Sequence, residues 1–576
     1  MHAQEIRICL IGLGPRGLAV LERLCANRPV GRRLSVYLVD PHLGSGGRTW
    51  HTGVSPLLVM NTVAEQVSMF TDRTVDCAGP IRPGPSLAEW AGLPPGTYAS
   101  RACYGRYLDW FLRQVIGTAP ADVGFRRHPV LAVDLSAEAD GRQRVHLADG
   151  TVLSGLDAVV LAQGHLGQRP DRTELALAEF ARRYGLTYVP PGNPAEVDLD
   201  VLAPGQAVAL RGMGLCFFDY LSLLTVGRGG RFSREQGGRL RYHESGREPR
   251  LVAGCRRGVP HHARAVNQKG AAGRHEPVFL TAERVAKLRA RAGGGTPLRF
   301  REDIWPELDR EVRAVYHGTY LARSGLAEPP PWDWHRLADP STPGHLGSAR
   351  TYRDWLLSYV DDDVLHARRG NRSGPRKAAL DVLRDLRNEL RELVEHGGLT
   401  AESWRSELRD WFNPLNAFLA VGPPLERVEE LGALIRAGVV EVVGPRMRVA
   451  CEPGEFVIHS ALPEAHPVRA LVEARLPVPD LRRTRDPLLR NLFERGEAAL
   501  HRLPLAEGGH LVTGGLAVTR RPCHLLDAAG GVHPRRFAFG VPTEGAHWLT
   551  AAGIRPFAAS VILADADAIA RACLPA

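Results

Sequence analysis

Residues 6–23, IRICLIGLGPRGLAVLER, decide the fold of this chain. An apolar run that predicts a strand leads directly into three glycines spaced G-x-G-x-x-G, and a helical pattern of apolar residues follows them. A second apolar run, residues 36–39, ends at Asp40, which lies 23 residues after the last of the three glycines. Together these features predict a βαβ unit that begins a dinucleotide-binding domain.

Each residue of this pattern has a physical role in binding a dinucleotide. Gly12 permits the tight turn, Gly14 lets the backbone approach a pyrophosphate, and Gly17 lets the helix pack closely on the strand. The helix N-terminus offers free N–H groups to phosphate, and Asp40 can accept hydrogen bonds from ribose hydroxyls. The alternative is a glycine-rich turn in an α/β protein that binds no nucleotide.

The composition is that of an ordinary globular chain. Its 576 residues suggest about two to four domains, and 44% are hydrophobic and 24% charged. The net charge is +10, but the arginines are spread along the chain without a basic block or a nucleic-acid-binding helix motif. We therefore expect no nucleic-acid partner. Either the genome favours arginine, or the protein binds an anionic substrate or a phosphorylated cofactor.

Cysteine usage and hydropathy indicate a cytoplasmic protein. Nine cysteines occur singly, without a C-x-x-C pair, as in a reducing compartment. The first predicted strand begins by residue 6, which leaves no room for a signal peptide. No apolar run approaches the roughly 20 residues that span a bilayer, so we expect no membrane partner. No H-x-x-x-H or Cys/His grouping predicts a metal site.

Separated segments are predicted to complete the first domain. Residues 156–165 read as a buried strand that ends at a turn with Gly164. Near the C-terminus, a strand at 537–539 leads into a turn at Gly540, and an alanine-rich helix follows at 560–572. Many flavoproteins close the FAD site with such a strand, loop and helix. The predicted FAD-binding domain comprises residues 1–170 and 505–576.

A second βα unit follows, with a strand at 207–210 and then Gly212 and Gly214. Phe217 stands where the third glycine belongs, so helix and strand should pack less closely. Short β-like runs at 439–443, 446–450 and 455–459 are expected to complete this unit. The predicted NAD(P)-binding-like domain comprises residues 200–280 and 435–475, and a helical domain at 281–434 is expected to face the substrate.

Arginines in two places are candidate anion ligands. Arg256 and Arg257 lie in a basic turn after a predicted strand and can clamp the extra phosphate of NADP, because guanidinium groups bind phosphate through paired hydrogen bonds. Arg384 and Arg387, in the helical region, can bind substrate carboxylates. The alternative in both places is a solvated surface arginine.

Six segments in combination resemble the FAD/NAD(P)-binding proteins common in actinobacteria, over essentially the whole chain. They are GLGPRGLAVLERL (12–24), MNTVAEQVSMFTD (60–72), VVLAQGH (159–165), RGMGLCFFDY (211–220), AGCRRGVPHHAR (253–264) and FGVPTEGAHW (539–548). That family resembles the flavin-dependent N-hydroxylating monooxygenases, which include ornithine and lysine hydroxylases. Some members resemble the aspartate N-monooxygenases that make nitrosuccinate. The resemblance implies an α/β flavoprotein with two dinucleotide-binding domains, Rossmann-like doubly wound sheets and a large helical insertion.

The resemblance also implies cofactors and residue roles. It implies FAD and NADP as cofactors, with O2 and a small amino-acid-like molecule as substrates. Gln66 and Ser68 would lie beside the flavin as catalytic candidates, together with His547; His547 and His165 are open to a general-base or a structural role. The residues implied to bind FAD are Gly12, Gly14, Gly17, Asp40, Asn61, Gly164, Gly540, Thr543 and Glu544. Those implied to bind NADP are Gly212, Gly214, Arg256 and Arg257.

The sequence therefore predicts an FAD- and NAD(P)H-dependent N-monooxygenase that hydroxylates the amine of an amino-acid-like substrate in natural-product biosynthesis. Two alternatives stay open. One is a flavoprotein oxidase or dehydrogenase without external NAD(P)H, because Phe217 alters the second turn and VIHSAL (457–462) stands where the hydroxylases have L-A-T-G-Y. The other is a non-catalytic flavin-binding scaffold. Neither the substrate nor the oligomeric state is indicated by the sequence.

Overall fold

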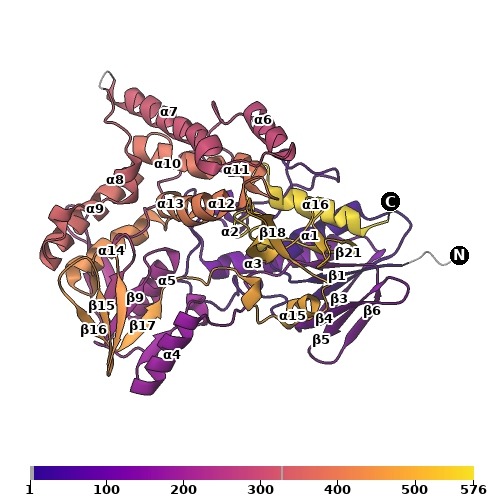
Figure 1. Ribbon diagram of the computed structural model, residues 1–576, viewed down its shortest axis with the longest axis horizontal. Coiled ribbons are helices and arrows are strands. Elements are labelled where there is room, and N and C mark those ends of the chain that lie inside the picture. The colour runs from indigo at the N-terminus through magenta and orange to yellow at the C-terminus, as the bar shows by residue number, and fades with distance from the viewer. Residues whose placement is uncertain (1–4, 326–327, 576) are drawn as a thin grey trace.

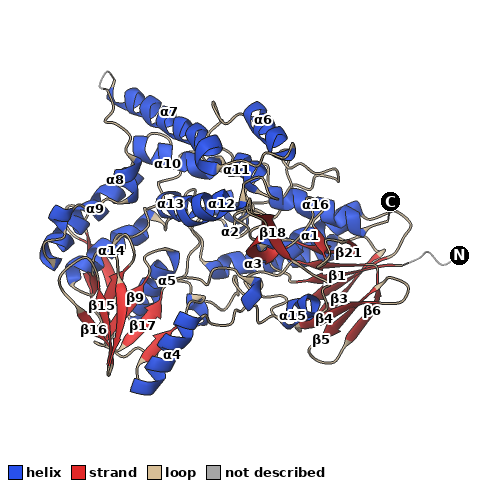
Figure 2. Ribbon diagram, in the orientation of Figure 1, coloured by secondary structure: helices blue, strands red, loops and turns tan. Residues whose placement is uncertain are grey.

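The computed structural model describes residues 5–325 and 328–575. Figure 1 shows two sheets at opposite ends of the molecule, with a layer of helices along one side of both. The same view coloured by secondary structure separates the two strand-rich ends from the helical layer (Figure 2). This is the mixed α/β architecture that the two glycine turns predicted.

The first sheet has six strands in the order β20-β21-β7-β1-β2-β3. All are parallel except the edge strand β20, which pairs antiparallel with β21. The strands are β1 (Ile6–Ile11), β2 (Leu34–Val39), β3 (Val123–His128), β7 (Ala158–Leu161), β20 (His524–Leu526) and β21 (Val532–Ala538). The predicted strands near residues 160 and 538 therefore join the first sheet on the far side of β1.

Both faces of the first sheet are covered, as its continuous apolar strands require. Ile8 and Leu10 of β1 point into a core formed with α1 (Pro15–Asn27), α3 (Arg101–Thr118) and α16 (Val561–Cys573). Cys9 and Ile11 point into the opposite core, beneath a small antiparallel sheet and α15. The covering elements of that face are β4 (Ala132–Ala137), β5 (Gln143–Leu147), β6 (Val152–Leu156) and α15 (Pro487–Glu494).

The second sheet has five parallel strands in the order β13-β12-β9-β17-β8. They are β8 (Thr187–Val189), β9 (Ala207–Arg211), β12 (Arg250–Gly254), β13 (Val440–Val442) and β17 (Ala470–Glu473). One face packs on α5 (Leu215–Leu224) and α14 (Leu425–Ala437), and the other on α4 (Arg172–Tyr184). Thus β8 belongs to this sheet although it precedes residue 200, and α14 packs on it although most of that helix falls within 281–434.

Two of the β-like runs expected to complete the second unit lie outside its parallel sheet. The β-like runs at 446–450 and 455–459 do not extend the parallel sheet; they pair with each other and with a third strand in an antiparallel sheet. The short turn between them explains this pairing, because two strands joined by so few residues can only lie antiparallel. The three strands are β14 (Arg448–Glu452), β15 (Glu455–His459) and β16 (His466–Val468).

The stretch of chain between β12 and β13 is mostly helical, as expected. Its helices are α6 (Ala282–Gly293), α7 (Trp305–Ser324), α8 (Trp334–Ala338), α9 (Ala349–Arg368), α10 (Pro375–Asp385), α11 (Arg387–Val394), α12 (Ala401–Ser403) and α13 (Asn413–Ala420). The remaining elements are α2 (Leu87–Ala91) and two hairpins, β10 (Arg231–Arg234) with β11 (Leu240–His243) and β18 (Leu500–Pro504) with β19 (His510–Leu516). Among the described helices, none combines the length and apolar character needed to cross a membrane.

Candidate cofactor and substrate site

The first glycine turn has the geometry of a phosphate cradle. Gly12 has a φ of +95°, and a Cβ there would lie 2.7 Å from the carbonyl oxygen of Ala162 on the neighbouring strand. A Cβ at Gly17 would lie 1.9 Å from the Gly12 carbonyl oxygen, so only glycine lets α1 pack this closely. Gly14 caps the N-terminus of α1 and faces open space, with no atom within 4 Å of a Cβ placed there. The turn therefore fits the pyrophosphate of a dinucleotide.

Asp40 supports this turn from the end of β2. Its buried carboxylate accepts a hydrogen bond from the backbone N–H of Leu13 at 2.6 Å and another from that of His42 at 2.7 Å. A carboxylate has acceptor capacity beyond two bonds, so Asp40 can fix the turn and still accept from a ribose. The predicted ribose contact stays a prediction.

Three distant segments meet beside the turn. Gly540 has a φ of +102°, and a Cβ there would lie 2.7 Å from the Arg16 side chain and 3.5 Å from the Gln163 carbonyl oxygen. Gly164, the residue after Gln163, has no atom within 4 Å of a Cβ placed there. Arg16, which stands at a variable position of the glycine motif, donates to the carbonyl oxygen of Thr550. The first turn, the end of β7 and the C-terminal loop thus converge.

The side chains of the C-terminal loop hold its shape. Thr543 is fully buried, donates to the Gly540 carbonyl oxygen at 2.8 Å and bonds Nδ1 of His547 at 2.8 Å. The Glu544 carboxylate accepts from the backbone N–H groups of Leu549 at 3.2 Å and Thr550 at 2.8 Å. Thr543 and Glu544 therefore have structural roles in the loop, where the sequence predicted cofactor contacts.

His547 is a poor candidate for a general base. Burial and the neighbouring His396 and His501 lower its pKa to about 3, so the imidazole stays neutral and binds a proton only weakly. Burial, followed by Arg16, also lowers the pKa of His165. The structural alternative fits His547 better than the catalytic prediction.

His547 belongs to a group of three potential metal ligands. Glu395, His396 and His547 offer donor atoms that lie within 4.8 Å of one another. The sequence predicted no metal site, and motif spacing could not reveal this group because residues 395 and 547 come from separate segments. Glu395 already accepts from the backbone N–H of Trp548 at 2.8 Å, and the T-shaped rings of the two histidines pack at 4.8 Å.

Gln66 and Ser68 lie in the interior, and their predicted place beside the flavin stays a prediction. Gln66 is 2% exposed; its amide nitrogen donates to the Gly270 carbonyl oxygen at 2.8 Å, and its amide oxygen accepts from Arg384 at 2.7 Å. Ser68 accepts from the backbone N–H of Phe70 at 3.1 Å. Asn61 is half-buried in the preceding turn. Gln66 thereby connects the FAD-side segment to the helical region.

Arginines from three segments lie near Arg384, which contacts Gln66, or near Arg387. Arg384, Arg387 and Arg391 come from α10 and α11, and Arg264 comes from the loop after β12. None of the four forms an ion pair with a carboxylate within the described ranges 5–325 and 328–575. Burial is the largest cause that lowers the pKa of Arg384, Arg387 (to about 9) and Arg391, and neighbouring arginines add to it for Arg384 and Arg387. We call these four residues the arginine cluster.

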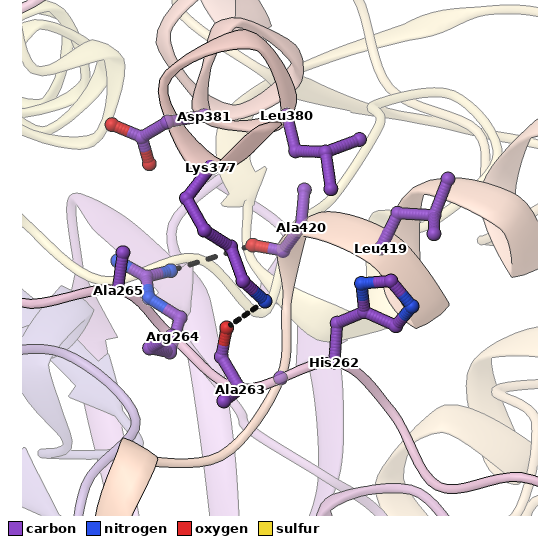
Figure 3. A pocket seen from close by; sticks show the side chains of 10 residues that line it. His262, Ala263, Arg264, Ala265, Lys377, Leu380, Asp381, Leu419 and Ala420 are labelled. Carbon is purple, nitrogen blue, oxygen red and sulfur yellow. Dashed lines mark hydrogen bonds between the residues drawn. The ribbon is translucent and has the colours of Figure 1, made fainter. Parts of the chain in front are cut away.

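Other cations share the acidic groups nearest Arg384 and Arg387. Asp381 and Asp385 both accept from Nζ of Lys269, at 2.7 and 2.6 Å, and Nη1 of Arg555 lies 3.5 Å from Asp385. Figure 3 shows Arg264 beside the carbonyl oxygen of Ala420, to which it donates, at the edge of a small cavity. A buried surplus of positive charge is unfavourable without a counter-ion. The arginine cluster therefore fits an anionic ligand, as Arg384 and Arg387 were predicted to do.

The second glycine turn repeats the first with one change. Gly212 has a φ of +123°, and a Cβ there would lie 2.9 Å from the Ala474 carbonyl oxygen. Gly214 caps the N-terminus of α5, and a Cβ placed there would lie 3.2 Å from Cε1 of the His261 ring. Phe217 is fully buried in the core of the second sheet, so α5 is anchored by an aromatic side chain instead of a close glycine contact.

Arg256 and Arg257 have different surroundings, and the predicted clamp on the NADP phosphate stays a prediction. Arg257 donates from Nε to the Ala338 carbonyl oxygen at 3.0 Å, and its guanidinium lies 4.8 Å from the centre of the Phe418 ring. Arg256 is exposed and lines a cavity that Arg257 does not line. Both residues lie in the bend that follows β12 and not in an extended strand.

Comparison with known proteins decides the class of the molecule. Residues 9–166 match a family model described as FAD-NAD(P)-binding. An L-aspartate N-monooxygenase (nitrosuccinate-forming) of Streptomyces davaonensis is 47% identical, over 100% of this chain and 98% of its own length. The nitrosuccinic acid synthase npaA of Aspergillus oryzae is 46% identical, over 99% and 93%.

The chain belongs to the family of nitrosuccinate-forming L-aspartate N-monooxygenases. It is a flavin-dependent N-monooxygenase that binds FAD and a nicotinamide nucleotide, and the predicted class of enzyme is confirmed. Among solved structures, cyclohexanone monooxygenase from Rhodococcus sp. Phi1 bound to NADP+ aligns with a TM-score of 0.43 at 12% identity, over 99% of this chain and 85% of the other.

Proposed function

We propose that this protein oxidises the amino group of L-aspartate to give nitrosuccinate, using FAD, NADPH and O2. The relatives named for that reaction match the chain over essentially its whole length. The arginine cluster is the structural observation that carries the proposal. L-Aspartate has two carboxylates, each of which can accept paired hydrogen bonds from a guanidinium, and four arginines without carboxylate partners among the described residues match that demand.

Bound FAD, reduced by the nicotinamide nucleotide, supplies the activation of O2 for oxygen transfer. We assign FAD to the three segments that meet at Gly12, Gly164 and Gly540. The protein holds the substrate for this chemistry. Arg384 is fixed by Gln66, whose own amide is fixed by Gly270. This chain of contacts sets the position of one carboxylate relative to the FAD-binding segments.

The arginine cluster also prepares the amine for reaction. An amine must lose its proton before its lone pair can accept an oxygen atom. Nearby positive charges disfavour an ammonium ion and lower its pKa. Arg264, Arg384, Arg387 and Arg391 therefore favour the neutral amine while they hold the two carboxylates, and binding and activation come from the same groups.

The first test replaces one arginine of the cluster. In Arg384→Met we expect the KM for L-aspartate to rise about 100-fold, because a buried charge-assisted contact is lost, while the FAD content is unchanged. The matched control is Arg376→Met on the same helix, since Arg376 pairs with Asp362 of α9. Substrate-dependent NADPH oxidation and nitrosuccinate, detected by mass spectrometry, are measured with L-aspartate, L-asparagine and L-glutamate.

The proposal fails if L-aspartate yields no N-oxidised product, or if L-asparagine is an equally good substrate. It also fails in its structural part if Arg384→Met and Arg376→Met have the same KM for L-aspartate. We further infer a cytoplasmic location, because all nine cysteines are free thiols and thiols persist in reducing compartments.

A further inference from the structure

Lys269 binds two acidic side chains beside the arginine cluster. Lysine is rare in this chain: it occupies positions 269, 287 and 377 only, against 73 lysines and arginines in total. Nζ of Lys269 lies 2.7 Å from Asp381 and 2.6 Å from Asp385, and the three side chains are 13%, 11% and 0% exposed, respectively. A compact ammonium group with three donors can bond two carboxylates at once. The contact is therefore a built part of the interior.

Asp381 depends on Lys269 more than Asp385 does. The two aspartates lie four residues apart on α10, so their carboxylates share one face of the helix. Asp385 has a second cation, because Nη1 of Arg555 lies 3.5 Å from it. Within residues 5–325 and 328–575, Asp381 has Lys269 as its one cation at ion-pair distance, and it accepts a hydrogen bond of 3.1 Å from the amide of Asn371. Without Lys269, the Asp381 carboxylate would need another cation.

The arginine cluster offers that cation. Asp381 and Arg384 are three residues apart on α10, a spacing at which opposite charges on a helix attract each other. Burial and then Arg264 lower the pKa of the Arg384 guanidinium, and Asp381 opposes them. Burial raises the pKa of Asp381, but Lys269 and then Arg384 outweigh burial and hold that pKa below its usual range. Lys269 and the arginine cluster therefore compete for one carboxylate.

We propose that Lys269 sets the affinity of the substrate site by keeping Asp381 from pairing with Arg384. An internal ion pair would occupy the guanidinium that a ligand carboxylate needs, and the ligand would then have to displace Asp381 in order to bind. Lys269 acts through Arg384, so it is a positioning residue for the arginine cluster. The inference rests on the proposed function in that the arginine cluster binds the carboxylates of the substrate.

The test measures the Kd of succinate by isothermal titration calorimetry of the oxidised, FAD-loaded protein. Succinate has both carboxylates of L-aspartate and no amine, so the measurement needs no turnover. Lys269→Met should weaken succinate binding about tenfold, because Asp381 is released toward Arg384. Asp381→Asn should tighten it about twofold, which is the size of an ion pair at this helical spacing. The double variant Lys269→Met/Asp381→Asn should bind succinate within about threefold of the unaltered protein, because the competing carboxylate is gone.

Lys287→Met is the matched control. Lys287 is an exposed lysine of α6 that pairs with Glu283 at 2.7 Å, so its loss should leave the Kd of succinate unchanged. If Lys269→Met does not fold, Asp381→Asn decides, because it keeps Lys269 and the contact of Lys269 with Asp385. A purely structural bridge predicts weaker binding in Asp381→Asn and no recovery in the double variant.

The proposal is overturned if Lys269→Met binds succinate like the unaltered protein, if Asp381→Asn weakens binding, or if the double variant binds no better than Lys269→Met. If the unaltered protein does not bind succinate, the proposal falls together with the assignment of the arginine cluster. If succinate binds as expected but L-aspartate gives no N-oxidised product, the proposed function fails and the role of Lys269 stands.

Discussion

Gly14 and Gly17 are three residues apart but serve different purposes. A Cβ at Gly17 would collide with the Gly12 carbonyl oxygen at 1.9 Å, whereas one at Gly14 meets no atom within 4 Å. Gly17→Ala should therefore push α1 away from β1 and lower the unfolding free energy of the apoprotein by about 1–3 kcal/mol. Gly14→Ala should change it by no more than about 0.5 kcal/mol and instead weaken FAD binding, because the methyl group occupies the space that a phosphate needs.

Chemical denaturation of both apoproteins and titration of each with FAD separate the two effects. If Gly14→Ala destabilises the apoprotein as much as Gly17→Ala, then the space at Gly14 is required for folding and not for phosphate. If Gly14→Ala binds FAD normally, the pyrophosphate does not approach the turn there.

The glycine turn could be predicted from the sequence because its residues are close together in the chain and each has one steric task. The arginine cluster could be predicted only in part. Arg384 and Arg387 were candidates, but on helical spacing alone they resembled solvated surface residues. Arg264 and Arg391 were not identified, since no local pattern shows that α10, α11 and the loop after β12 converge. The burial of charged residues on α10, such as Lys377 and Asp385, becomes visible only in the folded chain.

The C-terminal loop and the end of α11 form a pH-sensitive contact. Burial lowers the pKa of His396 and His501 to about 4 and that of His547 to about 3. Histidines whose pKa is depressed on folding stabilise the structure above their unfolded pKa of about 6.5, and this contribution is lost as the pH falls. The loss is about 2 kcal/mol for each histidine at pH 5. Burial raises the pKa of Glu395 to about 7, so this one residue acts in the opposite direction.

Three histidines outweigh one glutamate, so acidification from pH 7.5 to 5 should loosen residues 540–550 from α11. Hydrogen–deuterium exchange of that loop, corrected for intrinsic exchange rates, should rise at pH 5. His396→Asn removes one titrating ring and keeps a residue type that tolerates the φ of +51° at this position. In this variant the loop should stay protected to a lower pH. An unchanged pH profile would show that the buried imidazoles do not control the loop.

At the level of elements, the sequence predicted which segments are strands better than which strands pair. The predicted strands at 156–165 and 537–539 each lead into a glycine turn, and the structure includes them in β7 and β21 of the first sheet, where such turns gather at the carboxyl edge. β14 and β15 carry no such turn. Their apolar residues fit either a parallel extension or a hairpin, and only the short connection between them favours the hairpin.

At the scale of the whole molecule, a buried ion pair joins the two nucleotide-binding units. Nη2 of Arg101, at the start of α3, lies 2.5 Å from Oδ2 of Asp219 on α5, and their side chains are 16% and 10% exposed. Burial raises the pKa of Asp219 although Arg101 opposes that shift. Removing one partner of such a pair leaves the other charge buried and uncompensated. The geometry between the two sheets therefore depends on both residues.

Asp219→Ala should lower the unfolding free energy by about 3 kcal/mol. It should also slow NADPH-dependent reduction of the bound FAD, because the two units lose a fixed contact, while 2′,5′-ADP affinity is retained. The double variant Arg101→Met/Asp219→Leu should recover most of the stability, since apolar side chains can replace a buried pair. The exposed pair Arg48–Glu196 is the control, and Arg48→Ala should cost less than about 1 kcal/mol. Denaturation curves measure the change in unfolding free energy, and stopped-flow experiments measure the rate of FAD reduction. A double variant no more stable than Asp219→Ala would contradict the assigned role of the ion pair. The lost stability would then come from packing at α5 and not from the unpaired charge.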